Sequence, residues 1–213
     1  MTSPSTPDAP PGPPARTPAG IRVVYALYVW IAFLALAMTA VAGMVLPGLE
    51  RRRRIARGAA RALLRVAGMP LTVKWSDRIP QGQCVIVANH ASYLDGLVMM
   101  AALPPRFGFV IKREMSRVPL ANLLLRRIGS HFVERFNRHR GATDARRLMR
   151  TVSDGHSLVF FPEGTFAPQP GLLKFHTGAF AIAARAGCPV VPAVVRGPRH
   201  ALPPKNPPPQ PSA

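Results

Sequence analysis

Two short stretches place ionisable side chains at the ends of apolar runs. In the first, the buried-type run 85–88 leads directly into Asn89 and His90, with Asp95 five residues beyond the histidine. On a regular helix two residues five apart would point about 140° away from each other, so the pair requires a break in the chain. If Ser92 caps a helix, Asp95 lies in its first turn and can fold back toward the imidazole. This predicts a general base with an orienting carboxylate.

A simpler interpretation of the same residues stays open. Asp95 then only complements a helix dipole, and His90 makes a hydrogen bond within the loop. With six His and five Asp in the chain, about 0.14 pairs of this spacing are expected by chance. The spacing therefore needs support from elsewhere in the sequence.

The second stretch, 160–165, ends another apolar run with Pro162, Glu163 and Gly164. Proline removes a donor from a strand ladder, and glycine lets backbone N–H groups approach a ligand closely. The string Phe-Pro-Glu-Gly-Thr has a chance probability on the order of 10⁻⁴ in such a composition. Active sites of open α/β sheets gather at strand ends, and both stretches are such ends. The competing interpretation is a turn with a solvated Glu163.

Short apolar runs and helix-like stretches alternate beyond Pro70. We predict strands at 71–75, 84–88, 107–111, 131–133, 157–161 and 190–195. We predict helices at about 92–103, 118–128, 143–153 and 177–186. This alternation indicates an α/β fold with a central, largely parallel or mixed sheet covered by helices.

The composition narrows the class of protein. The 213 residues carry a net charge of +19, and 48% of them are hydrophobic. A single domain that is both basic and apolar suits an anionic membrane better than nucleic acid, for which no binding motif is present. Two cysteines exclude a disulfide-rich scaffold and indicate a reducing compartment, and the scattered histidines show no metal-ligand spacing.

The N-terminal region contains 27 consecutive uncharged residues, Val23–Leu49. At about 1.5 Å per residue this run exceeds the hydrocarbon core of a bilayer, so we predict a transmembrane helix over 21–49. Seven arginines follow between 51 and 65, which by the positive-inside rule places the rest of the chain in the cytoplasm. The prediction is a single-pass protein of the inner (cytoplasmic) membrane with a cytoplasm-facing domain. The alternative is a cleaved signal peptide.

The segments on either side of the predicted domain have their own patterns. Residues 50–69 alternate arginine with apolar residues, as in a basic amphipathic juxtamembrane helix that lies on anionic headgroups; a packed surface helix explains the pattern equally well. The proline-rich ends, 1–20 and 201–213, are expected to be disordered.

The two chemical stretches together resemble the glycerolipid acyltransferases, among them the 1-acyl-sn-glycerol-3-phosphate acyltransferases. Asn89-His90 with Asp95, followed some seventy positions later by 161–165, matches that family in order and spacing. The region 129–135 is similar to the family's second block and 190–194 to its fourth. The resemblance covers about 84–197, and four blocks in order are far more specific than one.

The resemblance implies acyl transfer from acyl-CoA or acyl carrier protein to a lipid hydroxyl, with these donors as co-substrates and no other cofactor or metal. His90 is then the general base and Asp95 orients it. The expected reaction converts lysophosphatidic acid into phosphatidic acid. A positioned base is needed because a lipid alcohol is a poor nucleophile, whereas the thioester is already activated. Backbone N–H groups near the strand ends are expected to stabilise the oxyanion.

The resemblance also implies substrate-binding residues. Arg135 is expected to clamp the acceptor phosphate, since a guanidinium can engage two phosphate oxygens. Lys112 and Arg113 are second candidates, for which a solvated basic face is the alternative. The acceptor site is expected to include Glu163, Gly164 and Thr165.

Some positions depart from the family pattern. Phe166 stands where many members have a polar or basic residue, and His176 where lysine is common. After Gly197 the family usually continues through a further strand, whereas this chain becomes proline-rich. We therefore expect an acyltransferase domain over 70–200 that is shortened at its C-terminus and has an exposed strand edge.

Two rival functions remain at this stage. One is an acyltransferase for another acceptor, such as glycerol 3-phosphate or a lyso-aminolipid. The other is a catalytically dead lipid-binding remnant.

Overall fold

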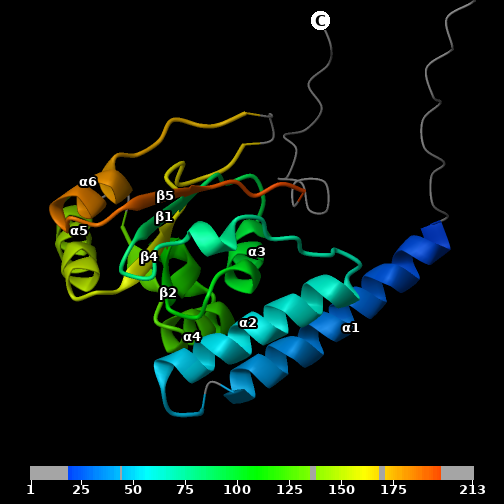
Figure 1. Cartoon of the computed structure of the whole chain (residues 1–213). Helices are drawn as coiled ribbons and strands as arrows, with labels where there is room; N and C mark the ends of the chain where they lie inside the picture. The colour runs from blue at the N-terminus through cyan, green and yellow to red at the C-terminus, as the bar shows by residue number, and fades with distance from the viewer. Residues whose placement is uncertain (1–18, 44, 135–137, 168–170, 198–213) are drawn as a thin grey trace, which may run out of the picture.

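The computed structural model describes residues 19–43, 45–134, 138–167 and 171–197 (Figure 1). The strands are β1 (Val85–Ala88), β2 (Phe107–Lys112), β3 (His131–Val133), β4 (Ser157–Phe160) and β5 (Val190–Ala193). The α-helices are α1 (Ala19–Gly43), α2 (Leu49–Val66), α3 (Asp95–Ala102), α4 (Pro119–Arg127), α5 (Arg138–Ser153) and α6 (Gly178–Arg185). Two 3₁₀ helices are η1 (Ser76–Arg78) and η2 (Arg113–Arg117). The predicted disordered ends lie almost entirely outside the described residues.

The five strands form one sheet in the order β3-β2-β4-β1-β5, and every described strand pair is parallel. β1 and β4 occupy the middle and are buried at all of their positions. Strands covered on both faces read as continuous apolar runs, which is why 85–88 and 157–160 lack polar alternation. The α/β fold predicted from the sequence is confirmed, and its sheet is parallel.

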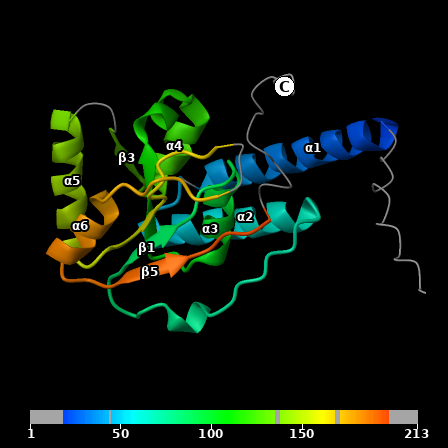
Figure 2. The same ribbon diagram turned by 90° about the horizontal axis from the view of Figure 1, so that it is seen from above.

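Helices cover both faces of the sheet. On one face Val85 and Leu158 pack with α5 and α6 through Val152 and Ile182. On the other face Ile86 packs with α3 and with the end of the described chain. Figure 2 shows α5 and α6 gathered at one end of the sheet and α1, α2 and α3 along another part of it. The core is thus two apolar layers separated by the strands that carry the candidate site.

One predicted strand, 71–75, is wrong. The segment is irregular, and its last residue Trp75 has a φ of 56°, outside the extended region. Val73 and Trp75 are 41% and 67% exposed, so of the three alternating apolar residues only Leu71 packs against the core. The other five predicted strands and all four predicted helices are present, with α5 beginning five residues earlier than predicted.

The apolar N-terminal run is divided between a helix and a turn. α1 ends at Gly43, the chain reverses before Leu49, and α2 packs back along α1 (Figure 1). A Cβ at Gly43 would lie 2.8 Å from Cγ2 of Ile55, so only glycine permits this close approach. Within the described ranges no helix has both the length and the hydropathy of a membrane span. The predicted transmembrane helix is therefore not confirmed and stays a prediction.

The arginine-rich segment forms a helix packed on one face, and its predicted contact with anionic headgroups stays a prediction. α2 buries Ala56, Ala60, Leu63 and Leu64 against α3 and neighbouring elements. Arg53 donates to the carbonyl oxygens of Ile128 (2.8 Å) and Arg106 (2.9 Å), and burial lowers the pKa of its guanidinium. Arg61 donates to the carbonyl of Ala101 at 2.8 Å. These arginines hold the hairpin onto the sheet domain by bonding otherwise unpaired carbonyls.

Candidate active site

The two chemical stretches meet at the carboxyl ends of the central strands. β1 and β4 are parallel neighbours, with Val87 opposite Phe160 in register. The loops that follow them, 89–94 and 161–166, therefore leave the sheet at the same edge. This is the place where ligands bind in open α/β sheets.

The His90–Asp95 pair is formed. His90 Nδ1 lies 2.9 Å from Asp95 Oδ2, and the aspartate side chain is completely buried. The same oxygen accepts hydrogen bonds from the backbone N–H groups of Ala91 (2.5 Å) and Ser92 (2.8 Å). These three donors to one oxygen make the loop fold around the carboxylate, which is the break that the five-residue spacing requires.

The predicted cap is wrong in one detail. α3 begins at Asp95 itself, and Leu94 occupies the N-cap position without a side-chain capping bond. Ser92 is completely buried, and its Oγ accepts a hydrogen bond from the Leu94 N–H at 3.2 Å. The side chain that organises this loop is therefore the carboxylate of Asp95, and not a helix-capping hydroxyl of Ser92.

This arrangement sets the tautomer of the imidazole. Because Asp95 Oδ2 already accepts two N–H groups, it acts as an ionised acceptor and Nδ1 of His90 carries the proton. Nε2 then bears a lone pair, and the imidazole side chain is 20% exposed. Asp95 Oδ1 has no hydrogen-bond partner among the described residues. A histidine held in this way can act as a general base.

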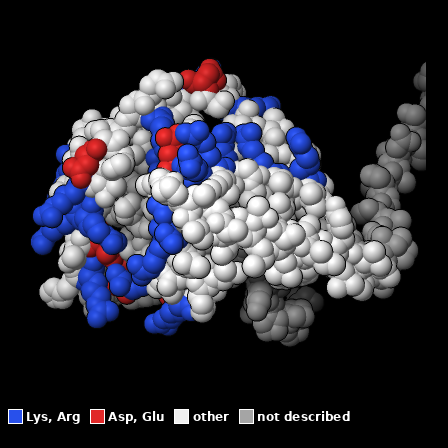
Figure 3. All heavy atoms as spheres, turned by 90° about the horizontal axis from the view of Figure 1, so that it is seen from below, with Lys and Arg blue, Asp and Glu red and all other residues white. Residues whose placement is uncertain are grey.

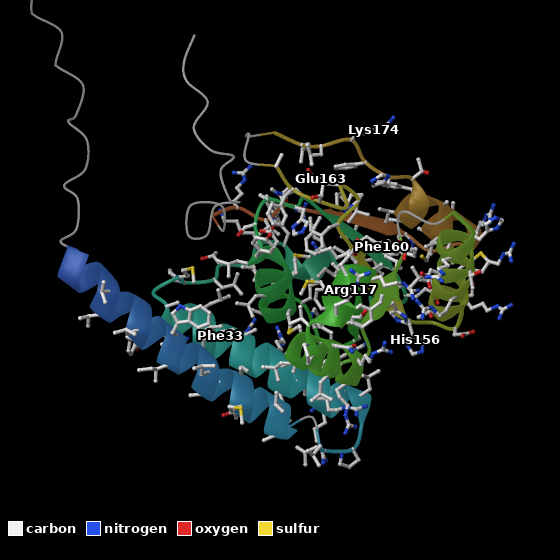
Figure 4. All side chains as sticks on the ribbon, turned by 180° about the vertical axis from the view of Figure 1, so that it is seen from behind. Phe33, Arg117, His156, Phe160, Glu163 and Lys174 are labelled. Carbon is white, nitrogen blue, oxygen red and sulfur yellow. The ribbon has the colours of Figure 1, made fainter. Side chains whose placement is uncertain are left out.

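Glu163 ties the two loops together. Its side chain is nearly buried, and Oε1 accepts the backbone N–H of His90 at 2.6 Å. Oε2 accepts the backbone N–H of Leu173 at 2.8 Å. The solvated-turn interpretation is therefore wrong. Figure 4 shows Glu163 just past Phe160 at the end of β4, inside the loop whose Lys174 points outward. Through these bonds Glu163 positions the backbone that carries His90.

The rest of the Phe-Pro-Glu-Gly-Thr stretch shapes the turn. Gly164 has a φ of 68°, a conformation that favours glycine, and its N–H bonds the Phe161 carbonyl at 2.9 Å. Thr165 is exposed beside it. The predicted acceptor-binding roles of both residues stay predictions.

Two aromatic rings contact His90 and a third packs on one of them, and sequence reasoning assigned none of the three to the site. Phe161 stacks on the His90 ring with centroids 4.6 Å apart, and Phe166 meets it edge to face at the same distance. Tyr93 meets Phe166 in turn at 4.7 Å. Phe166 was noticed only as a departure from the family pattern. The sequence signal that could have predicted them is that an aromatic residue lies close to each of the two polar strand ends.

Asn89 connects the site to the chain that follows the edge strand β5. Its amide donates to the Val195 carbonyl (3.1 Å) and accepts the Val195 N–H (2.7 Å), which closes a two-bond bridge across 106 residues. The residue just before the base is thereby attached to the chain beyond β5. This pair of hydrogen bonds gives Asn89 a structural role, which the sequence did not show.

Two of the three predicted phosphate-binding cations, Lys112 and Arg113, lie at the end of β2. Lys112 ends β2 and is exposed, whereas Arg113 opens η2 and forms ion pairs with Asp144 (3.2 Å) and Glu134 (3.7 Å). Arg113 also lines a surface hollow of about 340 Å³. The other residues lining it are His139, Arg140, Thr143 and Asp144. Arg135 lies outside the described residues.

The described residues contain neither a metal-ligand cluster nor an exposed cysteine. No group of three or more His, Cys, Asp or Glu side chains there could hold a metal ion. Cys84 and Cys188 are buried free thiols, and burial raises the pKa of both. Burial therefore disfavours the thiolate form of both side chains.

Comparison with known proteins agrees with this geometry. The family model described as acyltransferase matches residues 70–196, and the chain belongs to that family. The 1-acyl-sn-glycerol-3-phosphate acyltransferase of Haemophilus influenzae is 34% identical over 128 residues, covering 57% of this chain and 53% of that protein. The lyso-ornithine lipid O-acyltransferase of Pseudomonas aeruginosa is 33% identical over 141 residues, covering 64% and 52%.

A solved structure shows the same fold. The crystal structure of the 1-acyl-sn-glycerophosphate acyltransferase PlsC from Thermotoga maritima has a TM-score of 0.65 and 21% identity, covering 80% of this chain and 73% of that one. The resemblance to the glycerolipid acyltransferases is confirmed. The chain spans between 35% and 53% of the length of the first three curated relatives.

Proposed function

We propose that this protein transfers an acyl group from an acyl thioester to the hydroxyl of a lysophospholipid, with lysophosphatidic acid as the first acceptor to test. The observation that carries the proposal is the 2.9 Å contact between His90 Nδ1 and the fully buried Asp95. It leaves Nε2 as an available base at the sheet edge where a substrate would bind. Membership of the acyltransferase family and the lysophosphatidic acid acyltransferases among its relatives support this reaction.

The chemical step follows from the held imidazole. Nε2 of His90 takes the proton of the lipid hydroxyl as its oxygen attacks the thioester carbonyl. The tetrahedral intermediate collapses by breaking the carbon–sulfur bond, and the proton passes from the imidazolium to the leaving thiolate. Asp95 stabilises the imidazolium formed in between, and general-base catalysis of this kind contributes about 10²–10⁴-fold.

The backbone donors beside the base serve structure and not the oxyanion. The N–H groups of His90, Ala91 and Ser92 already bond the carboxylates of Glu163 and Asp95. The group that stabilises the developing oxyanion must therefore come from elsewhere at this edge. The proposal assigns it to backbone N–H groups beyond Gly164.

We assign the acceptor phosphate to cations at the same edge of the sheet. β2 lies beside β4 and ends at Lys112, so this side chain and Arg113 stand two strands away from the strand that leads to His90. The assignment includes Arg135, which follows β3 in the chain. Because Arg113 is held by Asp144 and Glu134, we expect it to keep the neighbouring backbone in place as much as to bind phosphate.

The bilayer is the proposed partner, and α1 supplies the contact. Its apolar side chains include Leu27 and Ile31, which are 58% and 67% exposed. Figure 3 shows an uncharged expanse over this part of the surface with Lys and Arg side chains gathered beside it. Apolar surface bordered by cations suits an anionic bilayer. We place the protein on the cytoplasmic face of the inner membrane, and the single-pass crossing stays a prediction.

The reaction is tested with detergent-solubilised full chain, labelled acyl-CoA and lysophosphatidic acid. We expect labelled phosphatidic acid from the wild type and none from His90→Ala with an unchanged melting temperature. Equal product from the variant would refute the mechanism. Acyl carrier protein as donor, and lyso-ornithine lipid or glycerol 3-phosphate as competing acceptors, define the substrates. A folded wild type that turns over none of them would favour the lipid-binding remnant.

The bilayer contact is tested by vesicle sedimentation. Leu27→Glu with Ile31→Glu should reduce binding to vesicles of mixed phosphatidylglycerol and phosphatidylcholine without lowering the melting temperature, because both side chains are exposed. Val73→Glu, which changes an exposed apolar residue outside α1, is the matched control. Equal binding by all three proteins would exclude α1 as the contact.

A further inference from the structure

The base is enclosed on several sides, although it must receive a hydroxyl from a lipid. Asp95 holds Nδ1 of His90, Phe161 stacks on the ring face, and Phe166 meets the ring edge to face with centroids 4.6 Å apart. Only 20% of the imidazole side chain remains exposed. Neither phenylalanine offers a hydrogen bond, so these contacts do not hold the proton or the tautomer.

Phe166 is itself covered on the outside. Tyr93, which is 60% exposed, meets its ring at right angles with centroids 4.7 Å apart. The two aromatic residues come from the two different loops that leave β1 and β4. Glu163 links these loops by bonding the N–H groups of His90 and Leu173. The hydrogen bonds of Glu163 that position His90 therefore also hold the two aromatic residues over it.

We infer that Phe166 and Tyr93 form an apolar cover that keeps water from His90 and directs the acyl group to the lipid hydroxyl. The inference rests on the proposed function. A base that can deprotonate a lipid hydroxyl can also deprotonate water, and the activated thioester is open to either. An aromatic wall disfavours a bound water, which needs two or more polar partners, but accepts the apolar part of a lipid.

The two outcomes differ in their products. Attack by the lipid hydroxyl breaks the carbon–sulfur bond, forms the new ester and releases the thiol. Attack by water breaks the same bond and gives the free fatty acid with the same thiol. The ratio of fatty acid to phospholipid therefore measures access of water to the base, independently of the total rate.

The experiment uses the full chain in detergent with labelled palmitoyl-CoA and lysophosphatidic acid, and separates fatty acid from phospholipid. Phe166→Ala should raise the ratio of fatty acid to phospholipid by about five- to tenfold. Phe166→Leu restores apolar volume and should return the ratio toward the wild-type value. Tyr93→Ala should give a smaller rise, because Tyr93 contacts Phe166 and reaches the base only through it.

Phe175→Ala is the matched control. Phe175 lies on the same loop, is 38% exposed and stacks on Phe180 with centroids 6.4 Å apart. Its removal should leave the ratio unchanged. A structural effect alone would lower the total rate and the melting temperature in these variants without changing which product forms.

Several results would overturn the inference. Ratios within about twofold of the wild type in both Phe166→Ala and Tyr93→Ala would do so. If Phe166→Ala does not fold, an unchanged ratio in Tyr93→Ala decides against it. A wild type that turns over neither acyl-CoA nor acyl carrier protein donors would refute the proposed function as well. An active wild type with unchanged ratios in the variants would refute only the cover.

Discussion

Asp95→Asn separates the charge of the orienting carboxylate from its shape. Oδ2 of Asp95 accepts three N–H donors, whereas Oδ1 has no partner among the described residues. The asparagine oxygen will therefore take the position of Oδ2, since an amide NH₂ there would face three donors. The NH₂ group is then left buried without a partner, which costs about 1–3 kcal/mol of folding stability.

The effect on catalysis comes from the missing negative charge. His90 still donates Nδ1–H to the amide oxygen, so the tautomer is preserved, but the imidazolium of the transition state loses its counter-charge. Two unit charges about 4 Å apart interact by about 4 kcal/mol at an effective dielectric constant of about 20. Part of this is replaced by the amide dipole. We therefore expect kcat to fall by about 10²–10³-fold.

The assay is the initial rate of thiol release from acyl-CoA at saturating acceptor, with a thermal melt of the same protein. A large loss of kcat with a melting temperature only a few degrees lower is the expected result. Asp95→Asn with a rate within about twofold of the wild type, beside an inactive His90→Ala, would refute the orienting role.

The remaining predictions concern stability and positioning. Burial, with Arg147 nearby, lowers the pKa of His131 from 6.5 to about 4. Between pH 6.5 and 4 the unfolded chain therefore binds a proton at this residue that the folded chain does not. The free energy of unfolding should fall by about 3 kcal/mol as the pH drops from 6.5 to 4. In melting experiments His131→Asn should remove this dependence of stability on pH. Gly43→Val should lower the melting temperature by a clash with Ile55, and adding Ile55→Ala should recover part of the loss. Glu163→Gln places an NH₂ opposite a backbone N–H and should lower kcat by about tenfold with an unchanged KM for the acceptor; a raised KM would instead show direct acceptor binding.

The chain uses buried acidic groups to shape its loops. Asp95 and Glu163 are both almost fully buried, and each bonds backbone N–H groups from more than one residue. Loops at the ends of buried strands expose many unpaired N–H groups, and a carboxylate satisfies several of them at once. The geometry of the candidate site and the local stability of this edge therefore depend on the same side chains.

The sequence alone determined most of the local elements of the sheet domain and the pairing of His90 with Asp95. Apolar runs without alternation identified the buried strands, because a strand covered on both faces has no polar side. The spacing of His90 and Asp95 predicted a break followed by a helix, since only that geometry lets the two side chains meet. Both signals are local, and each depends on fewer than a dozen consecutive residues.

Other features depend on contacts between distant segments, and only the tertiary structure decided them. The turn after Gly43 ends the helix inside the uncharged run and lets the arginine-rich α2 pack back along α1. Glu163 links two loops because β4 lies beside β1. This pairing places the carboxylate of Glu163 on the backbone N–H of His90, 73 positions earlier in the chain. Phe166, from the loop after β4, meets His90 and Tyr93, from the loop after β1, for the same reason. Residue types state which interactions are possible, whereas the order of strands in the sheet decides which of them form.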